Sequence, residues 1–215
     1  MYRALVGIGL LCALVIVSVF QITQPAIHEK MAAALDKAVF NVLPGARYKV
    51  EFQLINGAHF EQAAAAMQSD QVVYAGYDEH KHLIGIAVEA QGMGYQDVIN
   101  LLYGYAPDQQ AIIGMQVLDS RETPGLGDRI KKDPMFLRNF QRLDVALAAN
   151  KQSIANPVKA VKSGTKTEPW EIDSITGATV SSNAVAAIVR QSTNKWVPLI
   201  HQHLEEFNLG NEDIK

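Results

Sequence analysis

The chain has 215 residues, of which 48% are hydrophobic and 19% are charged, and its formal net charge is −3. These values exclude a disordered or low-complexity chain and suit one domain of ordinary size plus a small additional element. Its 19 basic and 22 acidic residues form no basic block, so nucleic acid is not an expected partner. The single cysteine, Cys12, excludes a disulfide framework and a cysteine-ligated zinc or iron–sulfur site within this chain.

An apolar segment comes first in the chain. Residues 4–20 carry no charge, and Ile22 extends the run toward the roughly 20 residues that a membrane-spanning helix needs. A cleaved signal peptide is the alternative, but the run ends without the small residues of a cleavage site. We therefore expect residues 1–24 to be a transmembrane anchor. Because Arg3 is the only charge before the span, the positive-inside rule places residues 25–215 on the periplasmic side of the cell inner membrane.

The elements after the anchor alternate irregularly between helix and strand patterns. A helical pattern runs from Pro25 to Phe40 and ends before Pro44 and Gly45. Strand patterns follow, at residues 48–55, 71–77, 82–89 and 111–118, with a shorter one at 157–161. A helix is expected from Pro134 to residue 143, and a final helix with an apolar face at 183–197. Since no strict βαβ alternation is present, the pattern predicts an α+β domain, an antiparallel sheet flanked by helices.

The first segment that could bind a ligand is Ser120–Asp128, directly after the apolar strand pattern at residues 111–118. Pro124 followed by Gly125 and Gly127 makes a rigid turn whose backbone N–H groups can point together at a ligand. Such a turn is also common as a purely structural loop.

The second segment is Asp173–Asn183, immediately before the final helix. Gly177 and Ala178 have little or no side chain, so a ligand can approach the backbone closely. Thr179 offers a hydroxyl, and further hydroxyl residues lie at the start of the helix. Small hydroxyl residues at a helix N-terminus can bind a phosphate group. The same residue types also cap helices for stability alone, so capping by Ser181 or Ser182 is the alternative.

These two segments resemble the signatures of a known family. The run Asp173-Ser-Ile-Thr-Gly-Ala-Thr179 is similar to the target motif of bacterial flavin transferases, and Glu122–Gly127 resembles the other signature of the same FMN-binding domain. Residues 91–95 resemble its upstream glycine–aromatic element. With the N-terminal span, nearly the whole chain is similar to the G subunits of Rnf ion-translocating NADH:ferredoxin oxidoreductases. The C subunits of sodium-pumping NADH:quinone oxidoreductases share the motifs but are generally longer.

The resemblance implies a particular cofactor and set of residues. It implies an electron-carrier subunit with FMN attached covalently to Thr179 through a phosphoester, loaded by a flavin transferase. It further implies an enzymatic role only as a redox subunit of an ion-translocating complex, with membrane and iron–sulfur subunits as partners and no complete turnover alone. The residues expected to bind the cofactor besides Thr179 are Thr176, Gly177, Ala178, Ser181, Ser182, Glu122, Thr123, Gly125, Leu126 and Gly127. No residue is expected to bind a metal or to be catalytic outside the flavin.

Several questions remain open from the residues alone. Glu122 could stabilise its turn or hydrogen-bond the flavin, and Asp173 could serve the transferase reaction or the geometry of the loop. Two other functions are compatible with the sequence: a stand-alone anchored flavoprotein in extracytoplasmic electron transfer, and a non-redox anchored protein that binds an anionic ligand reversibly.

Overall fold

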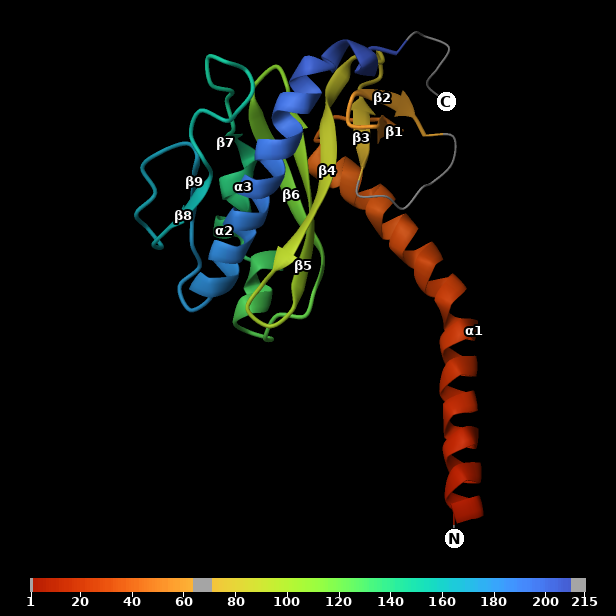
Figure 1. Ribbon diagram of the computed structural model, residues 1–215. Helices are drawn as coiled ribbons and strands as arrows, with labels where there is room; N and C mark the ends of the chain where they lie inside the picture. The colour runs from red at the N-terminus through yellow and green to blue at the C-terminus, as the bar shows by residue number, and fades with distance from the viewer. Residues whose placement is uncertain (1, 64–70, 210–215) are drawn as a thin grey trace. The chain divides into compact units, whose positions relative to one another are not determined.

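The computed structural model describes residues 2–63 and 71–209 (Figure 1). The chain divides between Lys37 and Ala38 into two compact units, a helical N-terminal one and a larger one that contains the sheet.

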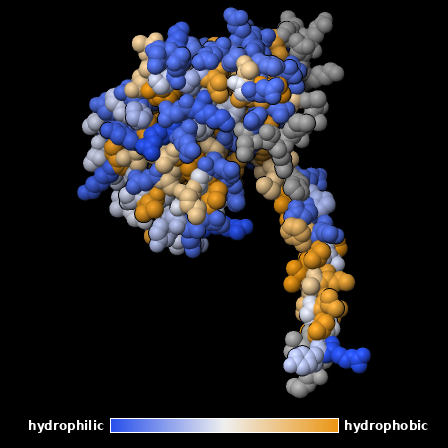
Figure 2. Space-filling model, viewed as in Figure 1, coloured by the Kyte–Doolittle hydropathy of each residue, from blue (hydrophilic) through white to orange (hydrophobic). Residues whose placement is uncertain are grey.

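The first unit consists of most of one long helix, α1 (Tyr2–Val42), which continues through Pro25. The predicted anchor and the predicted helix at 25–40 are therefore parts of one element, and the boundary expected after residue 24 lies inside it. Apolar side chains between Val6 and Ile22 are exposed along α1 (Figure 2). Among the described residues α1 is the one helix long and apolar enough to cross a membrane, judged by length and composition.

The second unit is built on a seven-stranded sheet in which every neighbouring pair is antiparallel. Its strand order is β2-β1-β3-β4-β5-β6-β7. The strands are β1 (Tyr48–Ile55), β2 (His59–Gln62), β3 (Val72–Tyr77), β4 (Leu83–Met93), β5 (Val98–Ala106), β6 (Ala111–Ser120) and β7 (Leu143–Asp144). A separate parallel pair is formed by β8 (Lys159–Val161) and β9 (Glu171–Asp173). The predicted α+β class with an antiparallel sheet is confirmed.

Short helices and one long helix complete this unit. They are η1 (Gly127–Lys131), α2 (Pro134–Arg138), η2 (Asn139–Gln141), α3 (Thr179–Gln202) and η3 (Leu204–Phe207). Helix α3 packs across one face of the sheet, where the Tyr103 hydroxyl and Ser192 Oγ lie 2.9 Å apart (Figure 1). The absent Cβ of Gly92 in β4 makes room there for Ile188 of α3.

The last turn of α1 packs on strand positions that carry no side chain. A Cβ at Gly114 of β6 would lie 2.6 Å from the Val42 carbonyl oxygen, and one at Gly104 of β5 would lie 2.7 Å from Leu43 Cδ2. Val42 and Leu43 are almost completely buried. Close approach of a helix backbone to a sheet needs glycine at these positions, because any Cβ would occupy the same space.

The structure also departs from the sequence prediction. The short strands β2, β7 and β9 were not predicted, and β7 begins at Leu143, where the sequence predicts the end of a helix. Strand β5 was not predicted, although it forms two long interfaces in the middle of the sheet. The final helix begins at Thr179 rather than at residue 183. The earlier start places Thr179 at the first helical position and puts Ser181 and Ser182 inside the first turn.

Candidate functional site

Glu122 joins three segments that are far apart in the sequence. The residue is only 5% exposed. Its Oε1 accepts hydrogen bonds from the backbone N–H groups of Tyr95 (2.9 Å) and Gln96 (3.1 Å). Its Oε2 accepts a hydrogen bond from the hydroxyl of Ser181. The turn between β4 and β5, the loop after β6 and the first turn of α3 therefore meet at one carboxylate.

Two glycines leave the space that this carboxylate occupies. A Cβ at Gly94 would collide with Glu122 Oε1, and a Cβ at Gly127 would collide with Oε2 and with the Ser181 hydroxyl. Of the two roles open to Glu122 from the sequence, its contacts support the structural one. The space left by the missing side chain of Gly127 is occupied by the Glu122 carboxylate and is not open to a ligand.

The turn between Glu122 and η1 is held by its own residues. Gly125 adopts φ +77°, a conformation that favours glycine, and its N–H donates to Asp128 Oδ1 at 2.6 Å. The Lys132 ammonium bonds the other oxygen of Asp128 at 2.9 Å, and this bond is the main cause that lowers the Asp128 pKa. The carbonyl of Thr123 accepts the N–H groups of Leu126 and Asp128. This arrangement leaves the Leu126 side chain exposed.

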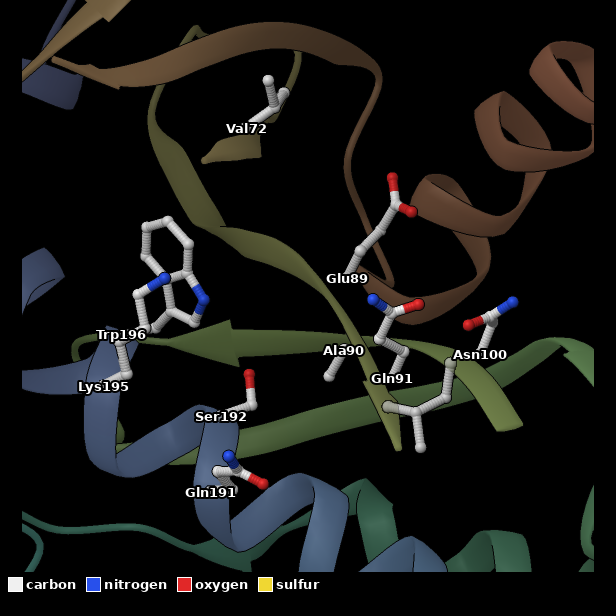
Figure 3. A pocket seen from close by; sticks show the side chains of 10 residues that line it. Val72, Glu89, Ala90, Gln91, Asn100, Gln191, Ser192, Lys195 and Trp196 are labelled. Atoms are coloured by element: carbon white, nitrogen blue, oxygen red, sulfur yellow. The ribbon is translucent and has the colours of Figure 1, made fainter. Parts of the chain in front are cut away.

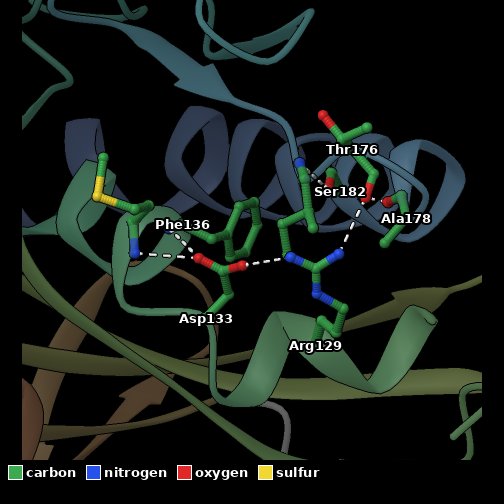
Figure 4. A network of polar contacts seen from close by, with 8 residues as sticks. Arg129, Asp133, Phe136, Thr176, Ala178 and Ser182 are labelled. Atoms are coloured by element: carbon green, nitrogen blue, oxygen red, sulfur yellow. Dashed lines mark hydrogen bonds and ion pairs between the residues drawn. The ribbon is translucent and has the colours of Figure 1, made fainter. Parts of the chain in front are cut away.

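The loop before α3 is tied to η1 and α2 by Arg129 (Figure 4). The Arg129 guanidinium donates to the carbonyl of Thr176 at 3.0 Å and to Asp133 Oδ2 at 2.8 Å. Asp133 also caps α2 by accepting from the N–H groups of Met135 and Phe136. Burial raises the Asp133 pKa, but the hydrogen bonds from Phe136 and Arg129 outweigh it and the net shift is downward. A charged Asp133 therefore orients the arginine that fixes the loop.

The start of the same loop is fixed by Asn139. Its Oδ1 accepts the N–H of Asp173 at 3.0 Å, and its amide nitrogen donates to the carbonyl of Asp173 at 3.2 Å. The carboxylate of Asp173 accepts the N–H of Gly164 at 2.7 Å. These contacts support a role for Asp173 in the geometry of the loop.

Of the four hydroxyl residues between positions 176 and 182 that are predicted to bind the cofactor, two have partners within the protein. Ser182 is fully buried, and its Oγ accepts the N–H of Ile175 (3.1 Å) and donates to the carbonyl of Ala178 (2.9 Å). The Ser181 hydroxyl is committed to Glu122. Both serines therefore hold the loop and the helix together.

The other two hydroxyls, those of Thr176 and Thr179, are exposed, and no described residue hydrogen-bonds to them. Thr179 is the first residue of α3, and the residue before it, Ala178, supplies no side-chain cap. The N–H groups at this helix end are thus open to an anion, and the partial positive charge of the helix favours one there.

A pocket of about 330 Å³ lies beside Thr179. Its lining combines the loop before α3 with the end of β8, which the β8–β9 pairing brings alongside. The lining residues are Ala160, Val161, Lys162, Ser163, Ser174, Ile175, Thr176, Gly177, Thr179 and Asn183. Sequence reasoning did not select Lys162, Ser174 or Asn183 as site residues. A lysine two residues before Gly164 was the available signal, but nothing in the sequence placed it near Thr179.

Four exposed apolar side chains belong to the segments that Glu122 joins. They are Met93, Tyr95, Leu126 and Val180. Exposed apolar side chains of this size on neighbouring segments are typical of a surface that binds a ligand or a partner.

A second pocket, of about 350 Å³, lies elsewhere in the fold, between β4, β5 and the second half of α3 (Figure 3). Glu89, Gln191, Lys195 and Trp196 are among its lining residues, and none of the predicted site residues lines it. At 1.5 Å per helical residue, Lys195 lies about 24 Å along α3 from Thr179.

Comparison with known proteins finds one matching family. Residues 94–194 match the family described as FMN-binding domain. The segment contains every residue of the two motifs, from Glu122 to Ser182.

The relatives extend the resemblance over most of the chain. It is 29% identical to the G subunit of the ion-translocating oxidoreductase complex of Methanosarcina acetivorans, over 84% of this chain and 85% of that protein. It is also 29% identical to the corresponding G subunit of Escherichia coli K12, over 80% and 78%. The resemblance to these proteins that the motifs indicated is confirmed.

Solved structures support the fold alone, since both are only 18% identical to this chain. The C subunit of the Na⁺-translocating NADH-quinone reductase of Parabacteroides distasonis matches with a TM-score of 0.61, over 80% of this chain and 95% of that one. The NqrC of Shewanella oneidensis matches with a TM-score of 0.51, over 80% and 85%.

Proposed function

We propose that this chain is a membrane-anchored electron-carrier subunit of an ion-translocating oxidoreductase complex, with FMN esterified to Thr179. The observation that carries the proposal is the position of Thr179, an exposed threonine at the first position of a helix without a side-chain cap, inside an FMN-binding domain. The resemblance to the G subunits of such complexes supports this setting.

The residues around Thr179 fit a phosphoester-linked flavin nucleotide. An ester oxygen on Thr179 would put the phosphate beside the open N–H groups of α3, which favour a negative charge. Gly177, at φ +84°, has no heavy atom within 4 Å of where a Cβ would stand, so the backbone leaves room for the phosphate. Among the other motif hydroxyls, Ser181 and Ser182 already have protein partners. Thr176 is also exposed but lies before the helix, whereas Thr179 is its first residue, so Thr179 is the favoured acceptor.

The roles of the remaining predicted residues follow from their contacts. Leu126 and Tyr95 present exposed apolar surface that can cover one side of the flavin ring. Thr123, Gly125 and Gly127 set the turn that carries Leu126, and Glu122 holds this turn against α3. FMN supplies the electron transfer when bound, and a phosphoester leaves its ring free for that chemistry.

The ester needs an activated donor. Condensing free FMN with a hydroxyl would release water, so we expect a flavin dinucleotide and a separate flavin transferase. In that step the threonine oxygen–phosphorus bond forms and the phosphoanhydride bond breaks. The hydroxyl proton is lost to a base, and the electron pair of the broken bond leaves with the nucleoside monophosphate.

The membrane setting follows from α1 and Arg3. We propose that α1 crosses the cell inner membrane once, with Arg3 on the cytoplasmic side and the FMN domain on the periplasmic side. Membrane and iron–sulfur subunits of the complex would then deliver and accept the electrons, and the chain alone would complete no turnover.

The test is a denaturing gel of the full chain, made with its transferase and viewed under ultraviolet light, followed by peptide mass spectrometry. We expect a fluorescent band and an FMN mass on the peptide that contains Thr179. Thr179→Val should abolish the fluorescence while leaving folding and membrane insertion intact. The matched control is Thr167→Val, which changes an exposed threonine outside the motif in the same way and should leave the band fluorescent. A dark wild-type band would refute the covalent linkage and favour a protein that binds an anionic ligand reversibly.

A further inference from the structure

We propose that the pocket beside Thr179 is a phosphate site in its own right, one that binds the flavin-side phosphate of the nucleotide reversibly, without an ester to Thr179. The inference deepens the proposed function and rests on it for the identity of the nucleotide. The site would consist of Lys162, Ser174 and the open N-terminus of α3.

The first observation is a buried hydroxyl without a partner. Ser174 lines the pocket, is 5% exposed, and its Oγ has no hydrogen-bond partner among the described residues. A buried hydroxyl without a hydrogen bond costs free energy, so such groups usually meet a ligand or an ordered water. The residues on either side of Ser174 do have hydrogen-bond partners: the Asp173 carboxylate accepts the N–H of Gly164, and the N–H of Ile175 donates to Ser182 Oγ.

The second observation is the charge of the pocket. Among the described residues that line the pocket, Lys162 is the only charged one, within a chain whose net charge is −3. No described residue forms an ion pair or hydrogen bond with the Lys162 ammonium. By contrast, Lys159 is paired with Glu171 at 3.1 Å, and Lys166 bonds Asn139 at 3.2 Å. The one lysine of this segment that lines the pocket is thus the one without a protein partner.

The third observation is that the carboxylate next to Ser174 in the sequence is bonded to another group. Asp173 precedes Ser174, but its carboxylate accepts the N–H of Gly164. The pocket therefore offers an ammonium, a free hydroxyl and backbone N–H groups, with no lining carboxylate to repel an anion. These groups match the acceptor oxygens and negative charge of a phosphate group.

The pocket is also large enough to hold more than a phosphate. Its volume of about 330 Å³ falls within the range of small-ligand sites, which begins near 300 Å³. Ala160, Val161 and Ile175 add apolar lining for the carbon chain next to the phosphate. A site of this kind would seat the nucleotide with its phosphorus next to Thr179.

The experiment measures reversible binding to the full-length Thr179→Val chain in detergent, where no ester can form. We expect FMN to bind, inorganic phosphate to compete with it, and riboflavin, which lacks the phosphate, to bind at least about tenfold more weakly. Lys162→Ala should weaken FMN binding about tenfold, equivalent to about 1.4 kcal/mol. Ser174→Ala should weaken it several-fold. The matched control is Lys195→Ala, which removes a lysine from the same domain and should leave the affinity unchanged.

Three results would overturn the inference: no reversible FMN binding, equal binding of riboflavin and FMN, or unchanged FMN binding in both Lys162→Ala and Ser174→Ala. Wild-type chain made in a host without the transferase repeats the test with the native threonine, in case the valine disturbs the helix start. A fluorescent wild-type band from a host with the transferase, together with no reversible FMN binding, would leave the proposed function standing and refute this pocket. Reversible, phosphate-dependent FMN binding together with a dark wild-type band would support this pocket and refute the covalent linkage of the proposed function.

Discussion

Replacing Glu122 by alanine tests whether this residue holds the site together. The change removes a buried acceptor of three hydrogen bonds, from the Tyr95 and Gln96 N–H groups and the Ser181 hydroxyl. A hydrogen bond to a charged group contributes about 1.5–3 kcal/mol, but Tyr95 and Gln96 lie at an exposed turn where water can replace part of the loss. We therefore expect Glu122→Ala to lower the free energy of unfolding by about 3–4 kcal/mol.

A graded variant separates the charge from the hydrogen bonds. In Glu122→Gln the amide oxygen can still accept the two backbone N–H groups, and the amide nitrogen can donate to Ser181. Only the charge contribution is lost, so we expect a decrease of about 1 kcal/mol.

The assay is thermal unfolding of the full chain in detergent, followed by the fluorescence of Trp170 and Trp196. For a chain of this size 1 kcal/mol corresponds to about 2–4 °C, so Glu122→Ala should lower Tm by about 6–16 °C. The matched control is Glu79→Ala, which removes an exposed carboxylate 3.5 Å from Arg47 and should change the free energy by less than about 0.5 kcal/mol. Equal, small decreases for Glu122→Ala and Glu79→Ala would refute the reasoning.

Two further predictions concern packing and pH. Gly114→Ala places a Cβ 2.6 Å from the Val42 carbonyl oxygen, where only backbone can move, so it should destabilise the chain by about 3 kcal/mol. Gly9→Ala, with nothing within 4 Å, is its control in the same Tm assay. Hydrogen bonds from the backbone of residues 167 and 168 and from Lys159 lower the pKa of Glu171 from 4.5 to about 2. A lowered folded-state pKa stabilises the protein above the unfolded-state value and loses that effect as pH falls through the folded-state value. Stability should therefore decline between about pH 4.5 and 2, and Glu171→Gln should flatten this decline; an unchanged slope would contradict the prediction.

Most of the sheet was predictable from local pattern, since β1, β3, β4 and β6 alternate or are bounded by turn residues. Strand β5 was not predicted because its residues, Val98–Ala106, form a nearly continuous apolar run without the period-two alternation of a half-buried strand. The start of α3 was placed four residues late because Thr179 and Val180 are β-branched and read as loop. Local pattern thus identifies elements better than their ends.

The candidate site was predictable only in part, for a related reason. The motifs selected the two loops and Thr179, because their residue types carry the chemistry. The direction of the Ser181 and Ser182 hydroxyls depends on where the helix begins, which the pattern missed. Lys162 and Ser174 come together through the parallel pairing of β8 and β9, a contact that no periodicity in the sequence encodes.

The ties that hold the loop before α3 have a consequence for how the chain matures. Three of the hydrogen bonds that hold this loop and the start of α3 join residues far apart in the sequence. Asn139 bonds Asp173 at a separation of 34 residues, Arg129 bonds Thr176 at 47, and Glu122 bonds Ser181 at 59. Since these contacts join such distant residues, Thr179 takes up its exposed position at the start of α3 only when the domain has folded. If Thr179 accepts FMN as proposed and the transferase recognises only the folded loop, a misfolded copy stays without flavin.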